Sequence, residues 1–159
     1  MKKILAAISL LLGFALPSLA DDRGQLIDVW KLQTYEIEFQ DTGERITPMG
    51  VHPNGYGTFT PEGRTIAIVT AEGREVPKTD ADRAAAFKTM ISYTGTYRIE
   101  GDHWITKVDV SWNESWVGTE QIRFYSVDGD TLSITSNFRP YPNYNERIAR
   151  GHLLWTREK

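Results

Sequence analysis

Residues 116–135, with the sequence WVGTEQIRFYSVDGDTLSIT, decide the fold. They predict two β-strands joined by a tight turn at Asp128-Gly129, because glycine adopts positive φ without a clash and aspartate hydrogen-bonds its own backbone. Successive side chains of a strand point to opposite faces. One face of the first strand therefore carries a mixed set of polar and apolar residues, namely Gln121, Arg123, Tyr125 and Val127. Such a face predicts a barrel wall whose interior holds something besides an apolar core.

Strand patterns separated by turns continue on both sides of this hairpin. They cover residues 29–40, 56–60, 64–71, 93–100, 103–112, 119–127, 131–137 and 146–157. The alternation of the first pattern changes phase near Thr34-Tyr35, which predicts a β-bulge or a strong bend. We therefore expect an all-β protein, an eight-stranded antiparallel up-and-down barrel.

Residues 79–92 predict one α-helix between the third and fourth strands. Thr79 and Asp82 approximate a capping box at its start, and apolar residues recur at helical spacing through Phe87, Met90 and Ile91. We expect this helix to pack on the barrel wall or across one mouth.

The loop at residues 41–54 is long and contains two prolines and two glycines. We expect a brief strand at residues 45–47. Long loops in compact domains often carry function, so this loop is either a candidate lid or a surface connection.

Several short motifs together resemble the bacterial lipocalin-like domain family in their order and spacing. They are WVGTEQIR at 116–123 followed by Tyr125, DGD at 128–130 and Leu132, with WKL at 30–32, GY at 55–56, TPEG at 60–63, residues 84–87, YTGTY at 93–97 and LLWTR at 153–157. The resemblance covers residues 26–157 and implies an up-and-down barrel. It implies much less about activity, because fold does not fix function.

The resemblance also implies a structural pair. In lipocalins, a tryptophan near the first strand is covered by an arginine near the end of the last strand. Trp30 and Arg157 occupy these places, although Asp28 stands where lipocalins have glycine. We expect them to close the barrel floor through a cation–π contact.

Residues 1–20 have the basic start, apolar run and small-residue cleavage site of a secretory leader. We expect cleavage after Ala20, a periplasmic or secreted location, no membrane span, and a single domain at residues 21–159. The mature chain would carry 16 basic and 21 acidic side chains. This balance argues against nucleic acid as a partner, and because cysteine is absent, stability must come from packing.

Arg123 is the first candidate for ligand contact, because a guanidinium inside a barrel must be paired or meet a ligand. The alternatives are an ion pair with Glu36, Glu120 or Asp109, or an outward position. The other candidate ligand-binding residues are Gln121, Tyr125, Tyr97, Tyr56, Trp104, Trp112 and Trp116. The aromatic members suit a pocket that orients an amphipathic molecule; ordinary core packing is the alternative for them.

The sequence predicts neither a metal site nor a cofactor. His52, His103 and His152 are far apart and form no spaced pair, and no catalytic motif is present. We therefore expect a binding protein for a small apolar or amphipathic molecule, as a monomer or weak dimer. The alternatives are an isomerase or hydrolase that uses the cavity, and a packed structural or partner-binding domain without a ligand.

Overall fold

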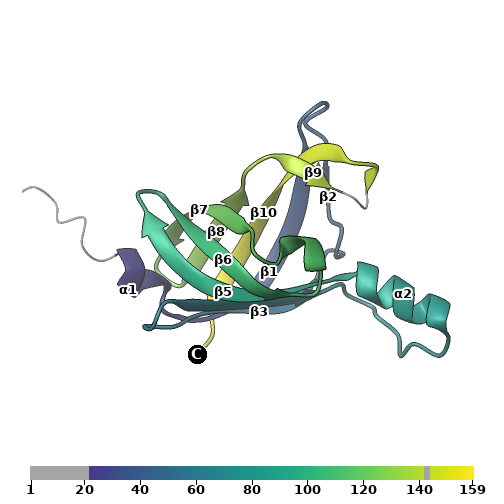
Figure 1. The fold of residues 1–159 in the computed structure, drawn as a ribbon, viewed down its shortest axis with the longest axis horizontal. Helices are drawn as coiled ribbons and strands as arrows, with labels where there is room; N and C mark the ends of the chain where they lie inside the picture. The colour runs from purple at the N-terminus through teal and green to yellow at the C-terminus, as the bar shows by residue number, and fades with distance from the viewer. Residues whose placement is uncertain (1–21, 142–143) are drawn as a thin grey trace, which may run out of the picture.

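The structure, a computed structural model, describes residues 22–141 and 144–159. The predicted leader and its cleavage site lie outside the described residues. Eight long strands form the barrel: β1 (Asp28–Phe39), β3 (Asn54–Phe59), β4 (Arg64–Thr70), β5 (Met90–Glu100), β6 (His103–Ser111), β7 (Glu120–Asp128), β8 (Thr131–Ser136) and β10 (Arg147–Arg157). Each pairs with the next, and β10 also pairs with β1, which closes the barrel (Figure 1). The predicted fold class is confirmed.

The β7–β8 hairpin turns its mixed face inward. Gln121 and Arg123 are buried, whereas Phe124 between Arg123 and Tyr125 is 41% exposed. The turn pairs Asp128 with Thr131, and Gly129 adopts a φ of 58°, which glycine accepts without strain. The interior of the barrel therefore holds polar groups as well as apolar ones.

A bulge in β1 lets both halves of the strand face the core. The register with β10 shifts between Leu32 and Thr34. Trp30 and Leu32 are buried before the shift, and Tyr35 and Ile37 are buried after it. The extra residue, exposed Gln33, allows this change of phase, as the sequence predicts.

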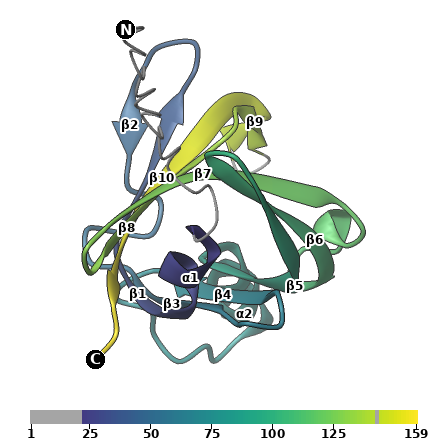
Figure 2. The ribbon, with the colours of Figure 1, turned by 90° about the vertical axis from the view of Figure 1, so that its left-hand side faces the viewer.

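One end of the barrel is closed. The short helix α1 (Asp22–Leu26) lies across it (Figure 2), with the Leu26 side chain entirely buried. The indole of Trp30 donates to the Leu26 carbonyl over 2.9 Å. The guanidinium of Arg157 lies 4.4 Å from the centroid of a Trp30 ring and pairs with Asp28 over 2.6 Å. The expected contact between Trp30 and Arg157 is present at this floor.

Helix α2 (Asp80–Lys88) lies between β4 and β5, the third and fourth long strands, and extends away from the opposite end of the barrel (Figure 1). Its capping box forms, with Asp82 N donating to Thr79 Oγ1 over 3.2 Å. None of its residues is buried, so the expectation that it packs on the wall or across a mouth is wrong.

The helix is also shorter than the sequence pattern suggests. Met90 and Ile91 belong to β5, where they pair with Thr70 and Val69. Pairing with β4 satisfies their backbone groups within the barrel, while the alanine-rich helical face offers little apolar area to bury. Tertiary pairing therefore outweighs the local helical spacing.

Three short elements lie near the end from which α2 projects. They are β2 (Arg45–Ile46), the brief strand expected in this loop, which pairs with β1; the 3₁₀ helix η1 (Glu114–Trp116); and β9 (Arg139–Tyr141), which pairs with β10. The sequence pattern shows residues 138–145 only as an aromatic loop, so β9 is an addition to the predicted fold. Residues from or beside these elements surround the open mouth of the barrel.

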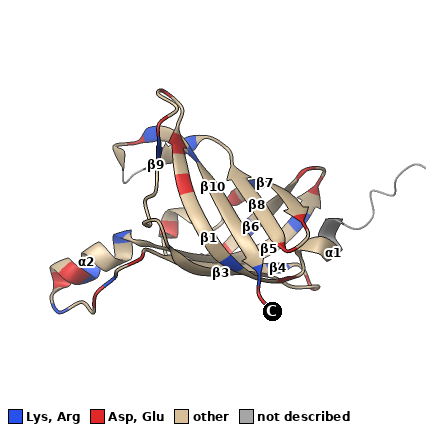
Figure 3. Ribbon diagram, turned by 180° about the vertical axis from the view of Figure 1, so that it is seen from behind, with Lys and Arg blue, Asp and Glu red and all other residues tan. Residues whose placement is uncertain are grey.

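The outer wall carries interspersed acidic and basic residues (Figure 3). Ion pairs link different strands: Arg150–Glu38 joins the neighbours β10 and β1, whereas Arg64–Asp109 and Arg98–Glu120 each reach across one intervening strand. Within the described part of the chain, no helix has the length and apolar character needed to cross a membrane.

Candidate functional site

A small chamber of about 60 Å³ lies inside the barrel. Most of its lining is apolar and comes from strands all around the wall, including Trp30, Phe59, Val69, Trp104, Leu132, Ile134 and Trp155. A cavity that holds benzene measures about 150 Å³. The inner chamber therefore has room for only a small chemical group.

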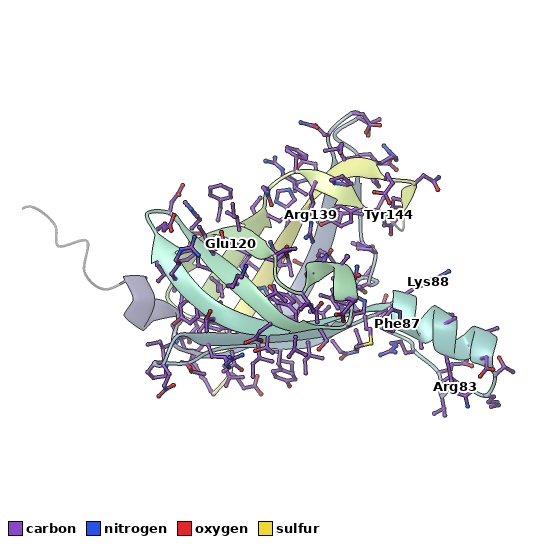
Figure 4. The ribbon with its side chains drawn as sticks, in the orientation of Figure 1. Arg83, Phe87, Lys88, Glu120, Arg139 and Tyr144 are labelled. Carbon is purple, nitrogen blue, oxygen red and sulfur yellow. The ribbon has the colours of Figure 1, made fainter. Side chains whose placement is uncertain are left out.

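A larger cavity of about 590 Å³ lies at the mouth. Figure 4 shows Arg139 and Tyr144 on one side of it, and Phe87 and Lys88, from the end of α2 nearest the barrel, on the other. Met49, from the loop at residues 41–54, also lines it. The residues that line both volumes are Tyr35, Ile91, Trp116, Arg139 and Tyr141. The mouth cavity and the inner chamber therefore adjoin.

Arg123 points into the barrel and lines the inner chamber. Its Nη1 donates to the Ile122 carbonyl over 2.8 Å, and its Nη2 lies 3.4 Å from Gln121 Oε1. The three carboxylates considered as partners are taken by other arginines: Glu36 by Arg45, Glu120 by Arg98 and Asp109 by Arg64. Among the described residues, no carboxylate forms an ion pair with Arg123.

Arg139 places a second guanidinium beside Arg123, and its side chain is partly buried. Its Nη1 donates to Gln121 Oε1 over 2.7 Å, and its Cζ lies 4.4 Å from the centroid of a Trp116 ring. Burial lowers the pKa of Arg139, and the positive charge of Arg123 lowers it further. Within residues 22–141 and 144–159, Arg139 has no carboxylate partner either. Sequence reasoning missed Arg139 because only the pairing of β9 with β10 brings it over the mouth.

Two tyrosines complete the polar end of the chamber. Tyr35 is 5% exposed, and burial, reinforced by neighbouring Tyr141, raises the pKa of its phenol well above the usual value. It therefore stays a neutral hydrogen-bond donor near neutral pH. A Cβ at Gly151 would lie 3.3 Å from the Tyr35 ring and 3.4 Å from the Tyr141 hydroxyl. Because glycine has no side chain, position 151 leaves space for the side chains of both tyrosines.

Five of the other predicted residues lie in or near the two cavities. Trp104 lines the inner chamber, Trp112 the mouth cavity, and Trp116 both. Gln121 does not line the chamber but accepts hydrogen bonds from both arginines. Tyr125 lines neither cavity and packs 5.3 Å from Trp104 between ring centroids.

Two tyrosines of the candidate set lie elsewhere. Tyr97 is buried against Phe59, and its hydroxyl donates to the Thr60 carbonyl over 3.2 Å; it packs in the core. Tyr56 is 47% exposed, which corrects its assignment as a ligand-binding residue. In β3 the inward positions fall to Gly55, Gly57 and Phe59, so alternation turns Tyr56 outward.

Two indole nitrogens add further donors. Trp104 Nε1 and Trp155 Nε1 are buried without a hydrogen-bond partner among the described residues, and both tryptophans line the inner chamber. Together with the two arginines, they make the lining rich in donors. A ligand that supplies acceptors would complement it.

The outer wall holds a polar row that could suggest catalysis. His152 Nε2 lies 2.7 Å from Glu38 Oε2, and His152 Nδ1 lies 3.3 Å from Thr135 Oγ1. None of these three residues lines either cavity, and Glu38 also binds two arginines. These side chains therefore form polar contacts between strands on the outer wall and lie away from both cavities. In the described chain, no group of three or more metal-ligating side chains comes together.

Comparison with known proteins agrees with the fold. Residues 27–158 match the model of a family described as a lipocalin-like domain, which confirms the resemblance seen in the motifs. None of the curated proteins compared with the chain matches it.

Proposed function

Because the chain belongs to the lipocalin-like domain family, we propose that it is a binding protein that takes a small apolar or amphipathic molecule into its barrel. One observation supports this function above the others. The mouth cavity of about 590 Å³ has a strongly aromatic lining and adjoins an apolar chamber. Ligand sites in proteins commonly measure about 300–1,000 Å³ and are lined in this way.

The two alternative functions find less support. A packed structural domain does not account for a cavity of this size. An isomerase or hydrolase needs an acid and a base within reach of the substrate. Among the described residues, Glu146 is the one carboxylate that lines the mouth cavity, and no histidine lines either volume.

The site of action belongs to the same proposal. The leader-like residues 1–20 support export to the periplasm or beyond the cell. Mass spectrometry of the protein from its native host should find an N-terminus at Asp21. Soluble cytoplasmic protein that retains Met1 would contradict export.

Binding is tested with a neutral solvatochromic dye such as Nile red. The dye should bind saturably to the wild type with a blue shift of its emission. Trp112→Ala, in the mouth cavity, should weaken binding by about tenfold, because a buried aromatic contact of about 1.4 kcal/mol is lost. Tyr56→Ala, on the outer wall, is the matched control and should leave the affinity unchanged. Absence of saturable binding, or equal effects of the two substitutions, would refute a binding site at the mouth.

A further inference from the structure

We infer that the ligand is an apolar carboxylic acid that enters the barrel carboxylate first and is held by Arg123 and Arg139. This inference rests on the proposed function and names the chemical class that the same cavity takes. The apolar body of the acid then remains in the mouth cavity, and the carboxylate reaches the junction with the inner chamber.

Two positive charges without an anionic partner among the described residues lie at the junction. Arg123 is buried and Arg139 is partly buried, and no carboxylate of the described chain pairs with either. Their shared side-chain acceptor is Gln121 Oε1, at 3.4 Å from Arg123 Nη2 and 2.7 Å from Arg139 Nη1. A neutral amide oxygen fixes two guanidiniums in place but neutralises neither. A cation that is removed from water without a charged partner is costly, so a bound anion would stabilise this pair of guanidiniums.

The hydrogen-bonding groups that line the inner chamber also favour a ligand that accepts hydrogen bonds. The indole N–H groups of Trp104 and Trp155 lack partners among the described residues, and the Tyr35 phenol stays protonated near neutral pH because burial raises its pKa. A carboxylate presents two oxygens that accept about four hydrogen bonds, and guanidinium groups match its planar geometry. The lining of the inner chamber thus offers several donors to an acceptor-only group.

The two volumes set the direction of entry. Arg123 lines the inner chamber but not the mouth cavity, whereas Arg139 lines both. The inner chamber, at about 60 Å³, accepts a head group but no apolar body, and the mouth cavity of about 590 Å³ accepts the body. Trp112, Trp116 and Phe87 line the mouth, where an apolar body would contact them. The limited inner space favours a flat carboxylate over a bulkier tetrahedral anion.

The test uses three probes with one body: naphthalene-2-carboxylate, naphthalene-2-carboxamide and naphthalene-2-phosphonate, measured by titration calorimetry at pH 7. Wild-type protein should bind the carboxylate about tenfold more tightly than the amide, since charge-assisted hydrogen bonds are the stronger ones. Arg123→Leu and Arg139→Leu should each remove this preference. Trp112→Ala should weaken the carboxylate and the amide by the same factor, because it touches the body alone.

Arg98→Leu is the matched control for loss of one positive charge. Arg98 lies on the outer wall, paired with Glu100 and Glu120, so this variant should keep the preference for the acid. The comparison of acid and amide on the wild type decides the question even where an arginine variant fails to fold.

Each other result has a distinct meaning. Equal binding of acid and amide by the wild type would overturn the inference and leave the proposed function standing. Tighter binding of the phosphonate than of the carboxylate would overturn the assignment to carboxylic acids. Failure of all three probes and of the neutral dye would overturn the proposed function itself.

Discussion

Gln121 connects the guanidiniums of Arg123 and Arg139. Its amide oxygen accepts from both guanidiniums, and its own Nε2 donates to Thr119 Oγ1 over 3.1 Å. Like charges held in a buried site repel each other, and the lowered pKa of Arg139 reflects both its burial and its neighbour Arg123. A neutral bridge preserves two unpaired positive charges, which an aspartate or glutamate at the same position would remove.

Gln121→Glu should therefore weaken binding of the acid and raise the stability of the fold. A carboxylate of the same shape would pair with Arg123 and Arg139, and the free energy of unfolding should rise by about 1–2 kcal/mol. Affinity for naphthalene-2-carboxylate should fall toward that for the amide, because an internal anion now occupies the guanidiniums. Urea denaturation and calorimetry measure the two effects. A variant that binds the acid as tightly as wild type would show that these arginines do not hold the carboxylate.

Arg157 serves the closed end of the barrel instead. Its guanidinium covers Trp30 and binds Asp28 and the Gln25 carbonyl. Arg157→Ala should lower the free energy of unfolding by about 1–3 kcal/mol through lost stacking and lost stem packing. Dye binding at the far mouth should stay unchanged. The free energy of unfolding of Arg157→Lys, which keeps the charge, should lie between those of the wild type and the alanine variant. An unaltered melting temperature in the alanine variant would rule out a structural role for the stack.

Strand alternation is the pattern from which the strands, and the faces on which their residues lie, can be predicted from this sequence. Alternation puts Arg123 on one face with Gln121, Tyr125 and Val127, and the structure turns that face inward. It also indicates the bulge of β1, because a change of phase is visible in adjacent residues. It does not show β9, because the three residues of this strand are too few for a visible alternation and are defined only by their pairing with β10. It also assigned Met90 and Ile91 to a helix, since local spacing does not record the partner strand.

Deletion of Gln33 tests the bulge directly. Without the extra residue, either Trp30 and Leu32 or Tyr35 and Ile37 must turn outward, because a shift of one position exchanges the two faces. The deletion variant should lose several kcal/mol of stability or fail to fold, since full burial of one large apolar side chain contributes roughly 1.5–3 kcal/mol. Gln33→Ala keeps the bulge and loses the hydrogen bond to Thr156, so it should cost at most about 1 kcal/mol. Chemical denaturation of both variants makes the comparison; a deletion variant as stable as wild type would contradict the assignment.

Helix α2 should behave as a unit separate from the barrel. Thr79→Ala removes the cap that accepts from Asp82 N, a loss of about 1 kcal/mol for helix formation. Because no residue of α2 is buried, the cost should be local. Amide hydrogen exchange over residues 80–88 should accelerate while the melting temperature stays the same, and Thr79→Ser should restore slow exchange. A lower melting temperature in the alanine variant would indicate that the helix supports the barrel.

The molecule as a whole separates its charges by location. Arginines of the outer wall meet carboxylates across strand pairs, whereas the two inner arginines meet only neutral groups of the described chain. Ion pairs at the surface stabilise little individually. Under the proposed function the two inner arginines select the ligand, whereas the arginines of the outer wall link strands.

Glu38 offers the clearest link between the outer wall and stability. Its carboxylate binds His152 at 2.7 Å, Arg150 at 3.0 Å and Arg45 at 3.0 Å, and thereby joins β1, β2 and β10 near the closing seam. The hydrogen bond with His152, followed by that from Arg150, lowers the pKa of Glu38 below its usual value. A lowered folded-state pKa means that Glu38 stabilises the fold above the unfolded-state pKa of about 4.3, and that this contribution is lost as pH falls through the folded-state value.

Glu38→Gln should consequently lower the melting temperature at pH 7, and its difference from wild type should shrink as pH falls from about 5 toward 3. At the acid end the wild-type side chain is protonated and as neutral as glutamine, so the two proteins converge. Glu75→Gln, at an exposed position in the loop before α2, should show no such convergence because it starts with little effect. Thermal unfolding across this pH range measures the difference. A gap between Glu38→Gln and wild type that stays constant down to pH 3 would show that the substitution acts through packing, and that the charge of Glu38 does not hold the seam of the barrel.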